Sequence, residues 1–196
     1  GKVYGTNITP TEDFTIPSGK TLTIASGQTL NIPEGVTLTN EGTLTVSEGG
    51  TLTVSEGGKL TVEQGGTLTG SVNGSTPPTI SGQLTDQTVT EGSTATFTVT
   101  ASAGEDGNTD TLTYQWQQST GSGGTWTDIS GATSASYTTK ATTTSMSGDQ
   151  YRCVVTSAAS RVSVVSSAAA LTVTEKPEPS RRPAVLGRQP TQTTPW

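Results

Sequence analysis

The side chains that could carry out chemistry in this chain are few. Cys153 is the single cysteine, and the chain contains no histidine to deprotonate it. Glu105, Asp106 and Asp110 share one polar segment and offer carboxylate oxygens of the kind that bind calcium, although acids in such loops are usually only solvated. No nucleophile–base pair, paired-carboxylate cleft or phosphate loop can be assembled. The sequence therefore predicts no catalytic residue, no metal site and no cofactor.

Trp126 is the one residue that suggests a ligand, because it follows the glycine-rich segment 121–124. An exposed indole at this position could stack on a sugar ring, but the interpretation we favour is that it covers the edge of the sandwich core. Asn7 and Asn73 begin short matches to the glycosylation sequon, which carry little weight on their own. Trp126 is thus the candidate ligand-binding residue.

Composition and charge point to an all-β protein. Hydrophobic residues make up 29% of the 196 residues and charged residues 13%, while threonine is the most frequent residue and glycine occurs 24 times. Threonine suits a half-exposed pleated surface, and glycine suits tight corners. The net charge of −6 argues against nucleic-acid binding, which needs a basic face. No apolar run approaches the roughly 18 residues of a membrane-spanning helix, so no membrane insertion is expected.

Residues 13–74 form an eight-residue repeat, of which TLTVSEGG is the clearest copy. Positions two and four are apolar and lie on one face of a strand, whereas positions one and three are mainly threonine and lie on the other. Each short strand is followed by a corner glycine, and these are Gly19, Gly27, Gly35, Gly49, Gly57 and Gly65. Since eight residues cannot bury their own apolar face, the copies must stack into a β-solenoid.

Several details of this stack stay open at the level of sequence. One coil holds either two or three copies, and the six-residue copy at 37–42 predicts a local irregularity in which Asn40 points inward. Residues 1–12 are expected to cap the first coil through Val3, Tyr4 and Ile8, and the exposed edge could pair with another chain. The recurring corner acids Glu34, Glu48 and Glu56 are either solvated or a cation column. The repeat resembles the β-helical stretches of large bacterial surface proteins and adhesins.

A second module begins where the octad stops. The segment Asn73-Gly74-Ser75-Thr76-Pro77-Pro78 carries turn and linker signals and predicts a fairly stiff join. Longer alternating segments follow and indicate about seven strands of a two-sheet sandwich. They include 94–101, 111–118, 125–129, 134–139, 150–156 and 162–173.

Three residues, Trp116, Cys153 and Tyr151, indicate an immunoglobulin-like fold for this module. Trp116 in YQWQ stands where the buried tryptophan of that fold belongs, and Cys153 in GDQYRC stands at one of its two cysteine positions. Tyr151 matches the tyrosine-corner position, and Val99 occupies the place of the partner cysteine. An apolar Val99–Cys153 contact is therefore expected in place of a disulfide. With WTDISGATSASYT, the module resembles Ig-like repeats of secreted and wall-associated bacterial proteins, which implies an extracellular setting.

The resulting prediction is an all-β chain: a short β-solenoid (β-helix) of octad repeats with an N-terminal cap at 1–75, followed by an immunoglobulin-like β-sandwich at 76–174. Residues 175–196 are rich in proline and polar residues and read as a tail or linker. Val99, Trp116, Tyr151 and Cys153 are the predicted structural core of the sandwich.

Three functions compete at this point. The first is a non-catalytic structural spacer of an extracellular bacterial surface protein, in contact with neighbouring domains of the same long chain. The second is an adhesion module that binds a host protein or glycan, which would require Trp126, Tyr114 and Tyr137 to face solvent together. The third is the accessory region of a secreted glycan-active enzyme.

Overall fold

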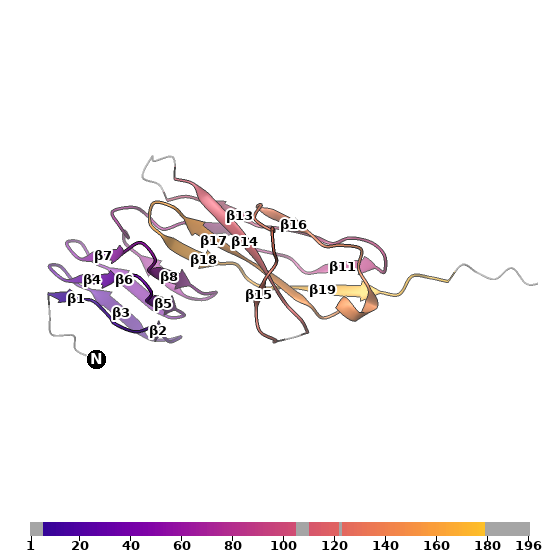
Figure 1. Cartoon of the computed structure of the whole chain (residues 1–196), viewed down its shortest axis with the longest axis horizontal. Coiled ribbons are helices and arrows are strands. Elements are labelled where there is room, and N and C mark those ends of the chain that lie inside the picture. The colour runs from indigo at the N-terminus through magenta and orange to yellow at the C-terminus, as the bar shows by residue number, and fades with distance from the viewer. Residues whose placement is uncertain (1–5, 105–109, 122, 179–196) are drawn as a thin grey trace, which may run out of the picture.

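The computed structural model describes residues 6–104, 110–121 and 123–178, and Figure 1 shows an elongated molecule with two modules end to end. We call residues 6–75 the stalk and residues 76–178 the sandwich. Within the described residues the fold is all-β apart from one short 3-10 helix, η1 (Thr144–Met146). None of its helices is long and apolar enough to cross a membrane. Val3, Tyr4, Glu105, Asp106 and the predicted tail beyond residue 178 lie outside this description.

The stalk contains nine short strands that pair in parallel with every third strand along the chain, in the ladders β1–β4–β7, β2–β5–β8 and β3–β6–β9. One turn of the chain therefore holds three repeats, which settles the choice between two and three. The strands are β1 (Asn7–Ile8), β2 (Phe14–Ile16), β3 (Thr21–Ile24), β4 (Thr29–Ile32), β5 (Thr37–Asn40), β6 (Thr43–Val46), β7 (Thr51–Val54), β8 (Lys59–Val62) and β9 (Thr67–Thr69).

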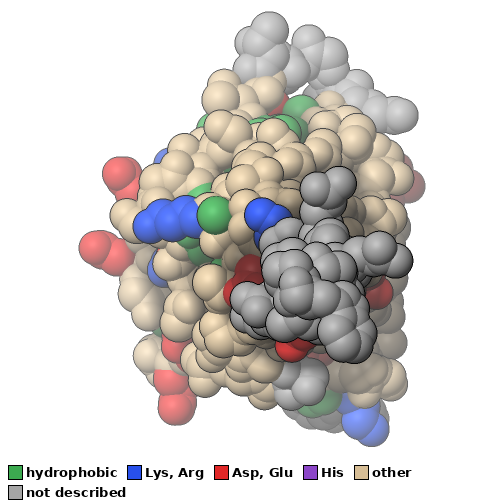
Figure 2. Space-filling model, turned by 90° about the vertical axis from the view of Figure 1, so that its right-hand side faces the viewer, with side chains coloured by type: hydrophobic (Ala, Val, Ile, Leu, Met, Phe, Trp, Pro, Cys, Tyr) green, Lys and Arg blue, Asp and Glu red, His purple; other side chains and the backbone are tan. Residues whose placement is uncertain are grey.

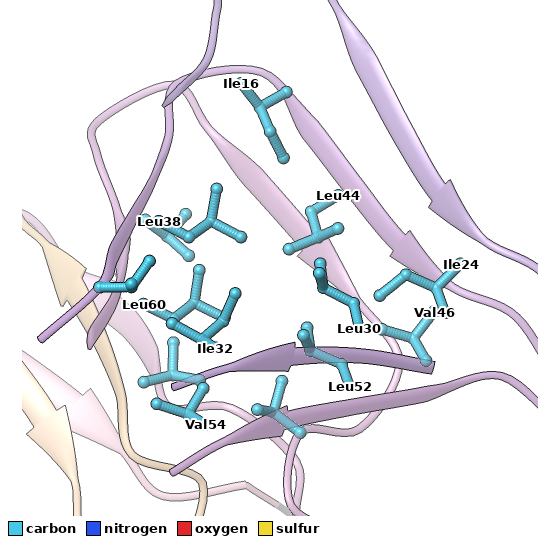
Figure 3. Close-up of a cluster of buried hydrophobic side chains, with 14 residues drawn as sticks. Ile16, Ile24, Leu30, Ile32, Leu38, Leu44, Val46, Leu52, Val54 and Leu60 are labelled. Atoms are coloured by element: carbon cyan, nitrogen blue, oxygen red, sulfur yellow. The ribbon is translucent and has the colours of Figure 1, made fainter. Parts of the chain in front are cut away.

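The core of the stalk is the column of apolar side chains at positions two and four of the repeat. Leu38 stacks in register on Leu60, and Leu30 stacks on Leu52, so side chains of one type lie above one another in neighbouring turns. Figure 3 shows these side chains pointing together between the three ladders. Leu38 and Leu44 are completely buried, whereas the threonines at positions one and three lie on the outer face. Ile8 forms part of strand β1 and packs against this core.

The corners use two glycines for two different reasons. The first glycine of each corner has a positive φ, which lies between 72° and 86° at the six predicted positions. Residues with a Cβ rarely adopt such a φ. The second lies against the turn beneath. A Cβ at Gly50 would stand 2.5 Å from the carbonyl oxygen of Ile24, which is closer than van der Waals contact allows. The second glycine of each Gly-Gly pair in the upper turns is therefore needed because the turns stack so closely.

The six-residue repeat makes its corner with the help of Asn40. This side chain is completely buried and takes the place of an apolar residue in the column. Its amide nitrogen donates to the carbonyl of Thr67 in the turn above at 2.8 Å, and its oxygen accepts from the backbone of Gly42 at 3.1 Å. The inward polar residue predicted for the short copy thus joins two turns and replaces the missing corner residues.

The sandwich has two layers that enclose a separate core. In the first layer, β14 pairs with β15 on one side and with β17 on the other. The far edge of β17 pairs with both β18 and β19, and β19 pairs in parallel with β11. In the second layer, β10 pairs with β13, and β12 pairs with β16. The strands are β10 (Thr79–Gly82), β11 (Gln87–Thr90), β12 (Thr96–Thr98), β13 (Thr100–Ser102), β14 (Leu112–Ser119), β15 (Thr127–Asp128), β16 (Ser136–Thr138), β17 (Gln150–Ser157), β18 (Val162–Val165) and β19 (Ala169–Thr174).

An aromatic cluster fills the space between the two layers. Phe97 stacks on Tyr151 with 4.7 Å between ring centroids, and Tyr137 bridges Tyr151 and Trp116 at 5.8 and 6.0 Å. The indole nitrogen of Trp116 donates to the carbonyl of Ser134 at 2.8 Å, so its one polar atom is satisfied. Such pairs add about 0.5–1.5 kcal/mol each to the energy of burial, which offsets part of what a disulfide would contribute.

The two modules share one hydrogen-bonded sheet. Strand β18 pairs with β17 on one edge and, in parallel, with β8, the last strand of its stalk ladder, on the other, in register Val162–Leu60, Ser163–Thr61 and Val164–Val62. Val162 is completely buried and belongs to the stalk core, and Val164 contacts both cores. The sandwich thereby covers the stalk edge at β8, which the sequence had left open to another chain.

The sequence predicts a single strand at 162–173, but the structure has two strands there, β18 and β19. The segment breaks at residues 166–168, so that β18 can reach the stalk while β19 pairs with β11. Ser166 holds the break, because its hydroxyl accepts from the backbone of Cys153 at 2.9 Å and donates to the carbonyl of Ser167 at 2.9 Å. Pro77 and Pro78 are buried beside this junction rather than exposed in a free linker.

Replacement of Gly50 by alanine tests the stacking of the turns. The added Cβ collides with the backbone of Ile24, so we expect a loss of about 1–3 kcal/mol in the free energy of unfolding, measured by urea denaturation. Lys20→Ala is the matched control, since Lys20 holds the same eighth position of an earlier repeat and its side chain is exposed. Equal stability of Gly50→Ala and the parent protein would contradict close stacking at this corner.

Candidate functional site

The junction carries a row of polar side chains that crosses from the sandwich to the stalk. Asp128 on β15 is the cross-strand partner of Gln117 on β14, which in turn lies opposite Arg152 on β17. The Gln117 amide donates to Asp128 at 2.8 Å, and Arg152 Nε donates to Gln117 Oε1 at 2.7 Å. Arg152 Nη1 then reaches Glu63 Oε2 of the stalk at 3.0 Å. Hydrogen-bond acceptors and donors therefore alternate along this row, from Asp128 in the sandwich to Glu63 in the stalk.

The alternation of β17 explains why Arg152 reaches the stalk. Tyr151 and Cys153 point into the sandwich core, so Arg152 between them points outward. Glu63 immediately follows β8, and β8 is joined to β17 through β18. The pairing of the strands therefore places both side chains on the same outer face. Their side chains are 17% and 26% exposed, so the ion pair is partly shielded from solvent.

Trp126 lies in this site and in neither hydrophobic core. The guanidinium carbon of Arg152 stands 4.5 Å from the centre of the indole ring, which is a cation–π contact. Trp126 is partly buried and lines a hollow of about 390 Å³ together with Glu41, Glu63 and Gln64 of the stalk. Trp126 is not among the side chains that pack against the sandwich core, and its ring contact is with Arg152.

Hydrophobic burial outweighs charge in holding the junction. An ion pair with this exposure contributes about 0.2–1 kcal/mol, and a cation–π contact at such a site about 0.5–1 kcal/mol. Complete burial of a valine such as Val162 contributes about 1.5–3 kcal/mol, and the strand pairing of β18 comes in addition. The polar row therefore orients two modules that the shared strand already holds together.

Asn73 is a junction residue that sequence reasoning missed. Its backbone nitrogen donates to Leu52, its side-chain oxygen accepts from Val54, and its amide donates to the carbonyls of Val54 and Ser160 at 3.0 and 3.2 Å. It thus ends the ladder of β7 and reaches the sandwich. Its positive φ of 53° fits the Asn-Gly signal, which was interpreted only as a turn and a sequon.

The four predicted core residues lie together in the sandwich. Val99, Trp116, Tyr151 and Cys153 are each at most 2% exposed and belong to one apolar cluster. Burial raises the pKa of the Cys153 thiol from 9.0 to about 12, despite a smaller opposing effect of a hydrogen bond with the Gln115 backbone. Burial, with a further contribution from Asp149, also raises the pKa of Tyr151. A neutral, enclosed thiol of this kind is a packing group and a poor nucleophile.

Of the acidic residues considered for calcium, Glu105 and Asp106 lie outside the described residues, and Asp110 is engaged in hydrogen bonds. Asp110 accepts from the hydroxyl of Ser157 at 2.6 Å and from the backbone of Ala159 at 2.9 Å, so it anchors a turn. Across the part of the chain that the structure describes, no three His, Cys, Asp or Glu side chains form a group that could hold a metal ion.

The three aromatic residues of the adhesion hypothesis do not share an exposed face. Tyr137 stacks in the sandwich core, and burial raises its pKa. Tyr114 packs against the same core, whereas Trp126 lies at the junction. Figure 2 views the sandwich end of the molecule, where hydrophobic side chains show as small separate spots on a surface made mostly of backbone and other uncharged groups. The exposed aromatic patch that would favour adhesion is therefore not formed by these residues.

Comparison with known proteins places the chain in a family. Residues 76–175, which are just over half of the chain, match the family described as Domain of unknown function (DUF8696), and the chain belongs to it. The match covers the sandwich, including β17, β18 and Trp126. No curated protein matches the sequence significantly.

Solved structures similar to part of the chain are immunoglobulin-domain proteins. A mutant complex of titin M10 with an obscurin-like 1 Ig domain is 23% identical, with a TM-score of 0.36 over 53% of this chain and 98% of that one. Immunoglobulin domains 1–5 of sidekick-1 are 19% identical, with a TM-score of 0.38 over 56% and 21%. Tandem Ig repeats of Dlar are 20% identical, with a TM-score of 0.37 over 50% and 49%. Scores of this size carry no information on ligand or function.

The buried thiol predicts how stability depends on pH. In the unfolded chain the thiol ionises with a pKa near 9.0, whereas in the folded chain it stays protonated up to about 12. Between these two pKa values, the thiol binds fewer protons in the unfolded state than in the folded state. The free energy of unfolding therefore falls as pH rises, by at most about 1.4 kcal/mol per pH unit from this group. Urea denaturation at pH 9 and 10, before tyrosines dominate, should show a steeper fall for the parent protein than for Cys153→Ala.

A second measurement separates this effect from general alkaline instability. Ellman's reagent at pH 8 should label Cys153 only as fast as the protein unfolds. Equal pH slopes for the two proteins, or immediate labelling of the folded protein, would refute the enclosed thiol.

Proposed function

We propose that this chain is a non-catalytic structural spacer of an extracellular bacterial surface protein, built as a three-sided β-solenoid fused to an immunoglobulin-like sandwich. The single observation that supports this most is the parallel pairing of β18 with β8, which makes one sheet of the two modules. A spacer must transmit position and force along its length. A sheet that runs through the junction resists bending there better than a linker does.

The organisation of the stalk supports the solenoid class. Three parallel ladders, a continuous apolar column and left-handed glycines at the corners are the features that stacked short repeats require. The extracellular bacterial setting rests on the resemblance of the octads and of the sandwich motif to surface-protein repeats. The lack of histidine and the enclosed Cys153 favour a role without catalysis.

The junction gives the spacer its stiffness in three ways. Val162 enters the stalk core, Asn73 of the stalk bonds to the carbonyl of Ser160, and Arg152 bonds to Glu63. These contacts lie at different points of the interface, so a hinge motion would have to break all of them together. The spacer would hold neighbouring domains of a long chain at a set distance and angle.

Small-angle X-ray scattering tests this proposal. The parent protein should fit one elongated conformation. Val162→Asp places a carboxylate in the stalk core, so we expect a loss of about 2–3 kcal/mol or more and a broader distribution of intramolecular distances. Ser163→Asp is the matched control, since it adds the same charge to the same strand on the outer face.

Two results would count against the spacer. One is scattering from the parent protein that requires an ensemble of angles between stalk and sandwich. The other is identical scattering and stability for Val162→Asp and Ser163→Asp, because the shared strand would then bear no part of the junction.

A further inference from the structure

Two neighbouring hollows at the junction share lining residues, and together we call them the groove. The smaller hollow, of about 390 Å³, is lined by Trp126 and Arg152 of the sandwich and by Glu41 and Gln64 of the stalk. The larger, of about 700 Å³, lies over the shared sheet beside Thr61. Glu63 and Arg152 line both hollows, so the two meet at this ion pair. Each volume is in the range of small-ligand sites.

Trp126 supplies a flat apolar surface in a polar groove. Its ring is partly exposed, and the Arg152 guanidinium lies over one face at 4.5 Å from the ring centre, so a ligand would stack on the opposite face. The electron-rich face of an indole attracts groups with partial positive charge. The C–H groups on one face of a sugar ring have this character. A ring held between the two modules can therefore offer a stacking platform without first being ordered by the ligand.

Hydrogen-bonding groups surround this platform. Glu41 and Gln64 are exposed at the smaller hollow, and within the described residues neither side chain is hydrogen-bonded to another side chain. Thr61 and Ser163, which are register partners across the β8–β18 pair, line the larger hollow, where the Ser163 hydroxyl shares a 2.8 Å hydrogen bond with that of Thr156. Sugar hydroxyls both donate and accept, so a mixture of carboxylate, amide and hydroxyl groups suits them.

The charge of the groove selects among ligand classes. Glu41, Glu56 and Glu63 are balanced by Lys59, Arg152 and Arg161, all of which line the two hollows. A nucleic acid or an acidic polymer would need an excess of cations, which the groove lacks. The balance favours a neutral ligand, and the presence of two neighbouring hollows favours a ligand of more than one ring.

We propose that this groove binds a neutral oligosaccharide, with Trp126 as the stacking platform and Glu41 and Gln64 as hydrogen-bonding partners. The proposal goes beyond the spacer role and does not depend on it, because binding and stiffness are measured separately.

A binding experiment on the intact chain tests the groove. The protein is screened on an array of neutral and anionic glycans and then titrated calorimetrically with cellotriose, chitotriose, mannotriose and sialyllactose. We expect saturable binding of at least one neutral glycan. Trp126→Ala should weaken it at least tenfold, and Thr125→Ala, a change at the exposed neighbour, should leave it unchanged.

A second variant guards against a structural effect of Trp126→Ala on the junction. Glu41→Gln combined with Gln64→Ala alters exposed side chains alone and should weaken binding at least threefold with unchanged scattering. The proposal is overturned if no neutral glycan binds at millimolar concentration, if only anionic glycans bind, or if binding is the same in both variants as in the parent protein.

Discussion

The structure depends on one constraint, which is that an eight-residue strand and corner cannot bury its own apolar face. Each turn of the stalk covers the turn next to it, and the last turn needs a cover from elsewhere. The chain meets this need with β18, whose Val162 continues the apolar column above Leu60. Stalk and sandwich are therefore connected by the same interaction that holds one turn on another.

This connection changes what the sandwich strands must do. The segment that pairs with one edge of β17 divides into β18 and β19. One piece completes the stalk and the other completes the sandwich, with Ser166 satisfying the backbone of Cys153 at the break. The outer face left beside this break carries Arg152 and Trp126. The proposed saccharide groove is thus a consequence of how the two modules join.

The sequence was sufficient for features that depend on local chemistry. The eight-residue period, the left-handed corner glycines and the inward Asn40 follow from side-chain alternation and from backbone sterics. The motif around Trp116, Tyr151 and Cys153 was enough to expect the core of the sandwich. These features repeat, or they lie close together in the chain, so a single sequence can show them.

Features that depend on contacts between residues far apart in the chain could not be predicted from the sequence. The pairing of Val162 with Leu60 joins residues about a hundred positions apart, and both strands look like ordinary members of their own modules. Three strands per turn could not be told from two, because either arrangement presents the same octad. Trp126 could be placed beside a glycine-rich turn, but its partner Arg152 and the stalk residue Glu63 come together only in the assembled junction.

Native-state hydrogen exchange of the β8 and β18 amides tests the central claim most directly. If the two modules are one structure, the protected amides of Leu60–Val62 and Val162–Val164 will exchange only with the same opening free energy as the cores on either side. Exchange of these amides at a much lower free energy, while both cores stay protected, would show that the modules separate freely and would contradict the account.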